Sequence, residues 1–260
     1  MMLRFLSRFF SETRWKTRIP FLWNLGIKGI LAIHRFNRRL RKGRYFPAVV
    51  FISVTNQCNL RCQGCWVTAT EPPRHLNTDM LEQIISASRK QGVTLFGILG
   101  GEPVFHPDIF SVMKNHPDCY FQFFSNGTTL TADVARKLAD AGNVTPLISI
   151  EGLEDVSDKR RRGINVYNRA LTALENCRRE GLVTGVATSV CKSNISELAT
   201  KDFVHQVIEA GALYLWYYIY RPSGPDPSPE LAFSEDEILQ LSEFIVDIRT
   251  RAPILVLAAY

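Results

Sequence analysis

The sequence predicts an α/β fold with a parallel sheet, preceded by a basic helical extension. From residue 47 onward, short apolar runs alternate six times with segments of helical periodicity. This alternation is typical of parallel strands covered by helices. The chain of 260 residues is 46% hydrophobic and 11% aromatic, which is enough to bury a sizeable core. The sheet can be a partial barrel, a closed barrel or a doubly wound sheet.

The first 45 residues differ from the rest of the chain in charge. They contain twelve Lys or Arg residues and one acid, Glu12, whereas residues 46–260 carry a net charge of −5. This asymmetry indicates an anionic partner for the extension, either a membrane surface or nucleic acid. Its longest uncharged stretch, residues 19–27, is too short to span a bilayer.

Two interpretations of residues 1–45 stay open. Aromatic residues such as Phe5, Trp15 and Trp23 alternate with Arg and Lys, so the segment can lie in a membrane interface. Alternatively, a pair of helices covers the bottom of the domain and leaves its bases in solvent. The first interpretation predicts peripheral membrane contact through residues 1–45. We expect no nucleic acid partner.

The cysteine content and the N-terminus indicate the compartment. Six cysteines in 260 residues are too few for a disulfide scaffold, and no signal peptide is present. We therefore expect a cytoplasmic protein, peripheral at the inner membrane face if the extension binds lipid.

The first β/α unit begins with the apolar segment 48–55, which predicts a strand buried on both faces. A loop with three cysteines follows. A helix is then expected over residues 78–92, with Thr78 as N-cap and Gly92 at its end.

The other five units repeat this order. Thr131 and Gly142 bound the third helix, and Ser234 with Glu237 forms a capping box at the sixth. The predicted strands are 94–99, 120–125, 145–151, 183–190 and 212–220, and the predicted helices are 107–116, 131–142, 166–181, 196–211 and 234–251.

The last segment, residues 253–260, is apolar and strand-like and has no polar tail. From this we expect the chain to be the front part of a longer protein. The expected organisation is a helical extension over residues 1–45 and an α/β core over residues 46–260 that is incomplete at its C-terminus.

Unusual residues follow the first four predicted strands. In a parallel sheet these loops emerge at one edge, where α/β proteins bind ligands. We therefore expect a single active site there. The segments are the cysteine loop, GGEP (100–103), SNG (125–127) and SIEG (149–152).

The cysteine loop contains Cys58, Cys62 and Cys65 in the sequence CNLRCQGC. A structural zinc site needs four ligands, and no fourth cysteine is near. Three thiolates suit an iron–sulfur cluster with one iron left open for a small molecule. The alternatives are three buried structural cysteines, or a zinc site completed by His75.

Cys58-x3-Cys62-x2-Cys65 after the first strand, with GGEP after the second, resembles the signature of the radical S-adenosylmethionine (radical SAM) enzymes over about residues 47–225. The resemblance implies a partial (β/α)6 TIM-like barrel whose three cysteines hold a [4Fe–4S] cluster. It also implies reductive cleavage of S-adenosylmethionine to a 5′-deoxyadenosyl radical, which abstracts hydrogen from a substrate. A flavodoxin- or ferredoxin-like protein would donate the electron.

The resemblance also assigns roles to residues after the second strand. Gly100, Gly101 and Glu102 correspond to the motif that holds the methionine amino group. Physically, glycine lets a backbone approach a ligand closely, and a carboxylate accepts hydrogen bonds from an ammonium group.

By the same resemblance, Ser125 and Asn126 approach the ribose or the methionine carboxylate, and Ser149 and Glu151 contact ribose hydroxyls. For the Asn-Gly dipeptide a plain β-turn is the alternative. Arg162 either reaches the carboxylate or belongs to a solvated basic loop.

One position departs from the family pattern. The family usually has an aromatic residue just before the third cysteine, whereas this chain has Gly64, with Trp66 after Cys65. We expect the backbone or Trp66 to make the adenine contact.

The substrate stays open. Peptide or protein maturation suits relatives with C-terminal cluster domains, whereas lipid-type chemistry suits a basic arm at a membrane. The alternative function is a non-catalytic iron–sulfur or zinc module with a basic arm. Such a module would not need the glycine motif after the second strand.

Overall fold

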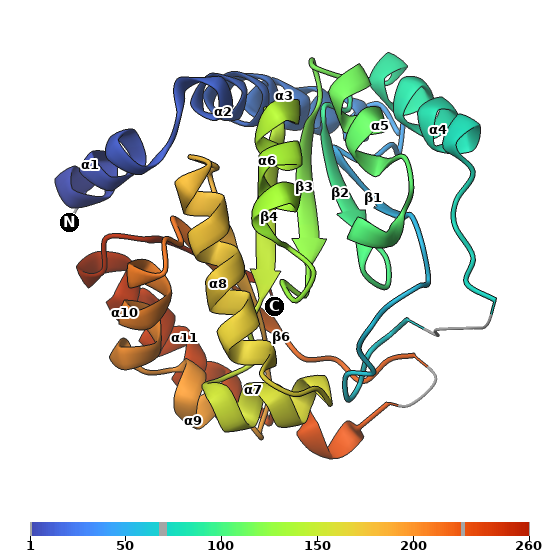
Figure 1. Ribbon diagram of the computed structural model, residues 1–260. Coiled ribbons are helices and arrows are strands. Elements are labelled where there is room, and N and C mark those ends of the chain that lie inside the picture. Colours follow the sequence, from blue (N-terminus) through green and yellow to red (C-terminus); the bar gives the residue numbers. More distant parts are fainter. Residues whose placement is uncertain (1, 68–71, 225–226, 260) are drawn as a thin grey trace.

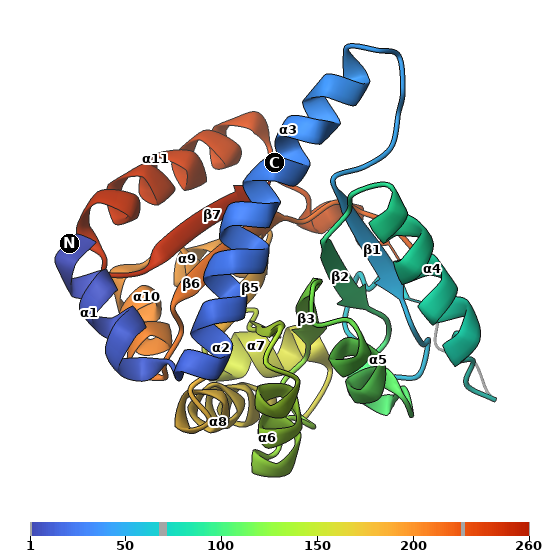
Figure 2. The same ribbon diagram turned by 90° about the horizontal axis from the view of Figure 1, so that it is seen from above.

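The computed structural model describes residues 2–67, 72–224 and 227–259, and its centre is a curled sheet of seven parallel strands. The strands hydrogen-bond in chain order (Figure 1), and β1 and β7 are the two edges (Figure 2). The predicted partial barrel is therefore confirmed. The strands are β1 (Val49–Ser53), β2 (Leu95–Leu99), β3 (Tyr120–Ser125), β4 (Val144–Ser149), β5 (Gly185–Val190), β6 (Tyr214–Ile219) and β7 (Leu255–Ala259).

The sheet has seven strands, one more than the six strands of the predicted β/α units. The additional strand, β7, lies in the apolar run 253–260 and pairs in parallel with β6. Tyr260, the last residue of that run, lies outside the described residues.

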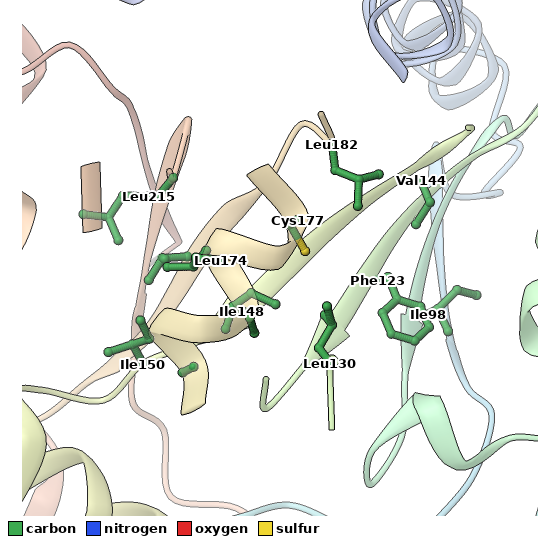
Figure 3. Close-up of a cluster of buried hydrophobic side chains, with 14 of the residues drawn as sticks. Ile98, Phe123, Leu130, Val144, Ile148, Ile150, Leu174, Cys177, Leu182 and Leu215 are labelled. Atoms are coloured by element: carbon green, nitrogen blue, oxygen red, sulfur yellow. The ribbon is translucent and has the colours of Figure 1, made fainter. Parts of the chain in front are cut away.

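Helices cover the convex face of the sheet, as expected from the alternation of apolar strand segments with helical segments along the chain. Figure 3 shows how α8 packs, with Leu174 and Cys177 directed at strand residues such as Ile148. The outer helices are α4 (Thr78–Lys90), α5 (Ile109–Asn115), α6 (Ala132–Ala141), α7 (Glu154–Arg161), α8 (Val166–Arg179), α9 (Ile195–Leu198), α10 (Lys201–Glu209) and α11 (Glu235–Arg251).

The expected helix boundaries are confirmed at two helices. The Thr131 side chain caps α6 by accepting from the Val134 N–H, and Gly142 ends the helix in the left-handed conformation. The capping box of Ser234 and Glu237 begins α11.

Three helix predictions were wrong. Asn77, and not Thr78, caps α4, because its side chain accepts from the Asp79 N–H. The helix expected over 196–211 is divided into α9 and α10, since Thr200 adopts an extended conformation and caps α10. The segment 154–161, where no helix was expected, forms α7.

The N-terminal extension lies across the end of the barrel at which the strands begin (Figure 1). Helix α1 (Met2–Glu12) comes first, and then α2 (Trp15–Pro20), the π-helical segment η1 (Phe21–Ile27) and α3 (Lys28–Leu40) form one continuous helical rod (Figure 2). Phe9 is buried against Phe21, with ring centres 5.6 Å apart. In the described part of the chain, no helix is long and apolar enough to cross a membrane.

Polar side chains of the extension bond to carbonyls that precede the strands, in the loops and at the end of α10. Arg8 donates to the carbonyls of Ile208 and Ala212, each at 3.0 Å, ahead of β6. Asn24 donates to the carbonyl of Pro117 at 3.0 Å, ahead of β3. Because buried carbonyls need donors, these contacts fasten the extension to the amino ends of the strands.

Candidate active site

A cavity of about 380 Å³ lies at the carboxyl ends of the strands. Its volume is within the range of roughly 300–1,000 Å³ that is usual for small-molecule sites. The segments that the sequence placed at this edge do meet here. The cavity is lined by Cys58, Leu60, Arg61, Cys62, Cys65, Trp66, Val67, Leu99, Gly100, Gly101, Phe124, Ser125, Asn126, Ser149, Arg161 and Arg162.

The cysteine loop turns sharply before its third cysteine. Gly64 has φ +68°, which an L side chain adopts only with strain. A Cβ at this position would also lie 2.7 Å from Cε2 of Tyr220, which follows β6. The ring of Tyr220 thus fills the space beside residue 64, and this explains why glycine stands there.

The three thiols lie on the cavity wall. In the part of the chain that the structure describes, no group of three His, Cys, Asp or Glu side chains converges on a point where one metal ion would sit. Iron–sulfur clusters are held by cysteine thiolates, and three cysteines that line one cavity suit such a group. His75, the fourth ligand of the zinc alternative, is not among the cavity-lining residues, and its ring packs against His106.

Burial raises the pKa of the Cys58 and Cys65 thiols. Without a cluster these groups therefore favour the protonated form. Metal ligation requires thiolates, so cluster assembly would release protons at this loop.

The glycine segment after β2 lies directly against the start of the cysteine loop. The Gly101 N–H donates to the Thr55 carbonyl, and the Glu102 N–H to the Gln57 carbonyl, both at 2.7 Å. A Cβ on Gly101 would lie 2.6 Å from the carbonyl carbon of Gln57. Glycine is therefore required for this close approach, which leaves the Gly100–Gly101 backbone facing the cavity.

Glu102 is completely buried beneath this backbone. Its carboxylate accepts from the Ser125 hydroxyl and from the Asn126 N–H, both at 2.8 Å. Burial nevertheless raises the pKa of Glu102 to about 7. The Val104 N–H also hydrogen-bonds to this carboxylate, so three donors leave it one lone pair with which to accept from a ligand.

Asn126 joins the end of β3 to the cysteine loop. Its side-chain amide donates to Asn59 Oδ1 at 2.9 Å and to Cys58 Sγ at 3.8 Å. Asn59 donates in turn to the Thr128 hydroxyl at 2.8 Å. Asn126 and Ser125 thus have structural bonds besides their place on the cavity wall. The role of Asn59 was not foreseen from the sequence.

The residues at the end of β4 divide into two groups. Ser149 lines the cavity, whereas Glu151 is buried behind it and pairs with Arg161 at 2.7 Å and with Arg160 at 3.8 Å. The Ser189 N–H also donates to Glu151, at 3.1 Å.

Arg161 connects this ion pair to the cysteine loop. Its Nη1 donates to Cys62 Sγ at 3.7 Å. Burial alone would lower the pKa of Arg161, but the Glu151 carboxylate and the Cys62 sulfur raise it above its ordinary value. Arg161 therefore carries its charge inside the site.

Sequence reasoning singled out Arg162 and missed Arg161. The signal was present as the run of bases 159–162, but only the fold shows which base turns inward. Residues 159–161 are the end of α7, and not a solvated loop. Arg162, in the left-handed conformation, lines the cavity.

Residues 52–204 match the family model of the radical SAM superfamily, which is more than half of the chain. The chain belongs to this superfamily. Radical SAM enzymes use a [4Fe–4S] cluster and S-adenosylmethionine, and the three cavity thiols fit such a cluster.

Among curated radical SAM proteins, the chain is similar to the AdoMet-dependent heme synthase of Methanosarcina barkeri. They are 29% identical over 197 residues, which cover 74% of this chain and 56% of that protein. The mycofactocin maturase MftC of Mycolicibacterium smegmatis is 27% identical over 225 residues, which cover 82% of this chain and 55% of that protein. The chain thus spans about half the length of these relatives.

The fold is also similar to that of solved radical SAM structures. SuiB of Streptococcus suis bound to S-adenosylmethionine has a TM-score of 0.73 at 18% identity, over 87% of this chain and 53% of SuiB. SuiB bound to precursor peptide SuiA also has a TM-score of 0.73, at 16% identity, over 88% of this chain and 52% of SuiB. These similarities show the shared partial barrel.

Proposed function

We propose that Cys58, Cys62 and Cys65 hold a [4Fe–4S] cluster that binds S-adenosylmethionine at its open iron. The supporting observation is that these thiols and the Gly100–Gly101 backbone line one cavity. The reduced cluster and S-adenosylmethionine would supply a radical that abstracts hydrogen from a substrate. The protein's part is to bind, to orient and to exclude water.

Glu102 is proposed to receive the methionine amino group. It lies behind the Gly100–Gly101 backbone that lines the cavity, and Ser125 and the Asn126 N–H already orient its carboxylate. Its pKa of about 7 leaves part of the population protonated in the absence of ligand. An ammonium group nearby would favour the charged form.

For the ribose and the carboxylate of S-adenosylmethionine, we propose Ser149, Arg162 and the Ser125–Asn126 turn, all of which line the cavity. Glu151 would reach a ribose hydroxyl only by sharing its carboxylate with Arg161. Its role in this proposal is therefore mainly to hold Arg161 against Cys62.

The organisation of the chain is part of the proposal, with residues 1–45 as an extension and residues 46–260 as the catalytic core. For the substrate we favour a peptide or a small molecule. The mycofactocin maturase and the peptide-bound SuiB support the first class, and the heme synthase supports the second. A flavodoxin- or ferredoxin-like protein is the proposed electron donor, and lipid-type chemistry is the alternative.

Anaerobic reconstitution with iron and sulfide tests the proposal. The reduced protein should give the electron paramagnetic resonance signal of a cubane cluster, and S-adenosylmethionine should change that signal. Release of 5′-deoxyadenosine should follow. A cluster signal that ignores S-adenosylmethionine would support the non-catalytic iron–sulfur module instead. Glu102→Ala should weaken the response to S-adenosylmethionine without loss of iron.

A further inference from the structure

The outer surface of the N-terminal extension is rich in exposed apolar side chains. Of the twenty-two large hydrophobic side chains that are exposed among the described residues, fourteen belong to residues 2–45. Trp15 is 66% exposed and Trp23 is 52% exposed. Soluble surfaces seldom gather so much apolar area unless it meets a partner.

The long helix of the extension has two distinct faces. Thr17 and Asn24 are buried and donate to carbonyls of the barrel, and Ala32 is buried as well. Trp15, Ile19 and Leu22, spaced at i, i+4 and i+7, form a stripe that is exposed. The barrel therefore covers one face of the helix and leaves an apolar stripe on the other.

The basic residues of the extension also fall into two groups. Arg8, Arg14, Arg18, Lys28 and Arg39 donate to backbone carbonyls of the chain. A second group is exposed and consists of Arg4, Lys16, Arg35, Arg38, Arg41, Lys42 and Arg44. The single acid of the extension, Glu12, is already paired with Arg8 at 2.9 Å. The exposed charge of this face is therefore positive.

We propose that this face, residues 2–45, docks on an anionic lipid bilayer. Tryptophan and aliphatic side chains would enter the boundary between headgroups and acyl chains, and the exposed bases would pair with phosphates. A second copy of the chain fits less well, because two faces of the same positive charge repel each other. Nucleic acid would use the bases but leave the aliphatic stripe in water.

The fold then dictates how the enzyme is oriented. The extension bonds to loops at the amino ends of the strands, whereas the cavity lies at their carboxyl ends. A barrel docked by its base directs the cavity away from the lipid. Under the function proposed above, the substrate arrives from the aqueous side, as a peptide or soluble small molecule would.

Vesicle co-sedimentation with the full chain tests the docking. Binding is expected to vesicles of phosphatidylcholine with phosphatidylglycerol, and to be much weaker to phosphatidylcholine alone. Trp15→Ser combined with Trp23→Ser should weaken binding roughly tenfold or more. The matched control, Ile164→Ser combined with Leu239→Ser, removes exposed apolar side chains elsewhere and should change nothing.

Charge reversal provides the second comparison. Arg38→Glu combined with Arg41→Glu should weaken binding by at least about tenfold, since each substitution replaces attraction to the anionic surface with repulsion. Lys114→Glu combined with Lys201→Glu, exposed bases outside the extension, is the control with the same change of net charge.

Brominated lipids test the orientation. Their quenching of tryptophan fluorescence should persist in Trp66→Phe and be largely lost when Trp15 and Trp23 are both replaced by Phe. Quenching of Trp66, at the cavity, would overturn the orientation. Absence of binding to anionic vesicles would overturn the docking. Self-association or RNA binding that the same variants abolish, without vesicle binding, would assign the face to those partners instead.

The docking and the proposed chemistry can fail separately. The variants of the extension should keep the cluster signal and 5′-deoxyadenosine release in detergent-free solution, because they lie at the opposite end of the barrel from the cavity.

Discussion

An ion pair at the carboxyl end of the barrel is buried, whereas one at the amino end is exposed. At the carboxyl end, the side chains of Glu151 and Arg161 are only 9% and 11% exposed, and they form an ion pair inside the site. At the amino end, Arg14 pairs with Glu180 while its own side chain is 58% exposed. Buried charges hold one geometry because each loses water and needs its partner, whereas exposed pairs are screened.

The carboxyl end of the barrel thus positions the groups of the site, whereas the amino end attaches the extension. At the carboxyl ends of the strands lies a cavity whose polar groups are each held by several hydrogen bonds. At the amino ends, hydrogen bonds to backbone carbonyls hold the extension, and bases and tryptophans of the extension face outward. Substitutions of the buried groups at the carboxyl end should therefore change chemistry and stability together, whereas substitutions of exposed side chains at the amino end should change neither.

The largest expected effect is loss of the cluster. Cys58→Ala, Cys62→Ala or Cys65→Ala should each abolish stable iron binding and 5′-deoxyadenosine release, because a cubane with two protein ligands is poorly held. Iron analysis after anaerobic reconstitution measures this. Cys177→Ala, at a buried cysteine on α8 in the core, should retain the iron. Normal iron in any of the three loop variants would remove that cysteine from the ligand set.

The next effect concerns the two ion pairs directly. Arg161→Met leaves the buried Glu151 without its closest partner and should lower the free energy of unfolding by about 3–5 kcal/mol. Arg14→Met, at the amino end of the barrel, should lower the free energy of unfolding by no more than about 1 kcal/mol. Urea unfolding of the cluster-free protein gives both values. Equal losses in the two variants would contradict the contrast between the ends.

The pH dependence of the free energy of unfolding tests the raised pKa of Glu102. Its pKa is raised from 4.5 to about 7, so between these pH values the folded chain holds a proton that the unfolded chain has released. The stability due to this protonation is complete below about pH 4.5 and is lost as the pH rises through 7. The total change is roughly 3 kcal/mol.

Glu102→Gln has no such proton. Relative to the unsubstituted chain, this variant should gain up to roughly 3 kcal/mol in free energy of unfolding between pH 4.5 and 8. Glu243→Gln, an exposed change on α11, should follow the unsubstituted chain at every pH. A Glu102→Gln curve parallel to the control would show that Glu102 titrates normally.

The smallest effect compares two glycines with the same backbone angle. Gly43, after α3, and Gly64, in the cysteine loop, both have φ +68°, but only Gly64 has a neighbour that a Cβ would meet. Gly43→Ala should cost about 1 kcal/mol from backbone strain. Gly64→Ala should cost about 1–3 kcal/mol more, because of the contact with Tyr220. Thermal unfolding measures both, and in a Tyr220→Ala background, itself destabilised by the loss of a buried ring, Gly64→Ala should cost only about as much as Gly43→Ala.

Much of the fold could be predicted from the sequence because its elements are local. The apolar runs of the strands, the caps at Thr131 and Ser234, and the glycine at the end of α6 act within a few residues. The errors occurred where a neighbour competed or a helix was short. Asn77 caps α4 in place of the expected Thr78. Helix α7 has no apolar periodicity by which it could be predicted, since Glu154–Arg161 is almost entirely polar.

The sequence by itself determined the grouping of Cys58, Cys62 and Cys65, because three residues of one short loop cannot lie far apart. It also determined that GGEP follows a neighbouring strand at the same edge of the sheet. Only the tertiary structure decided that Arg161, and not Arg162, reaches Glu151 and Cys62, and that Tyr220 fills the space beside Gly64. These contacts join segments far apart in the chain, so they depend on packing and on burial, which periodicity and spacing do not contain.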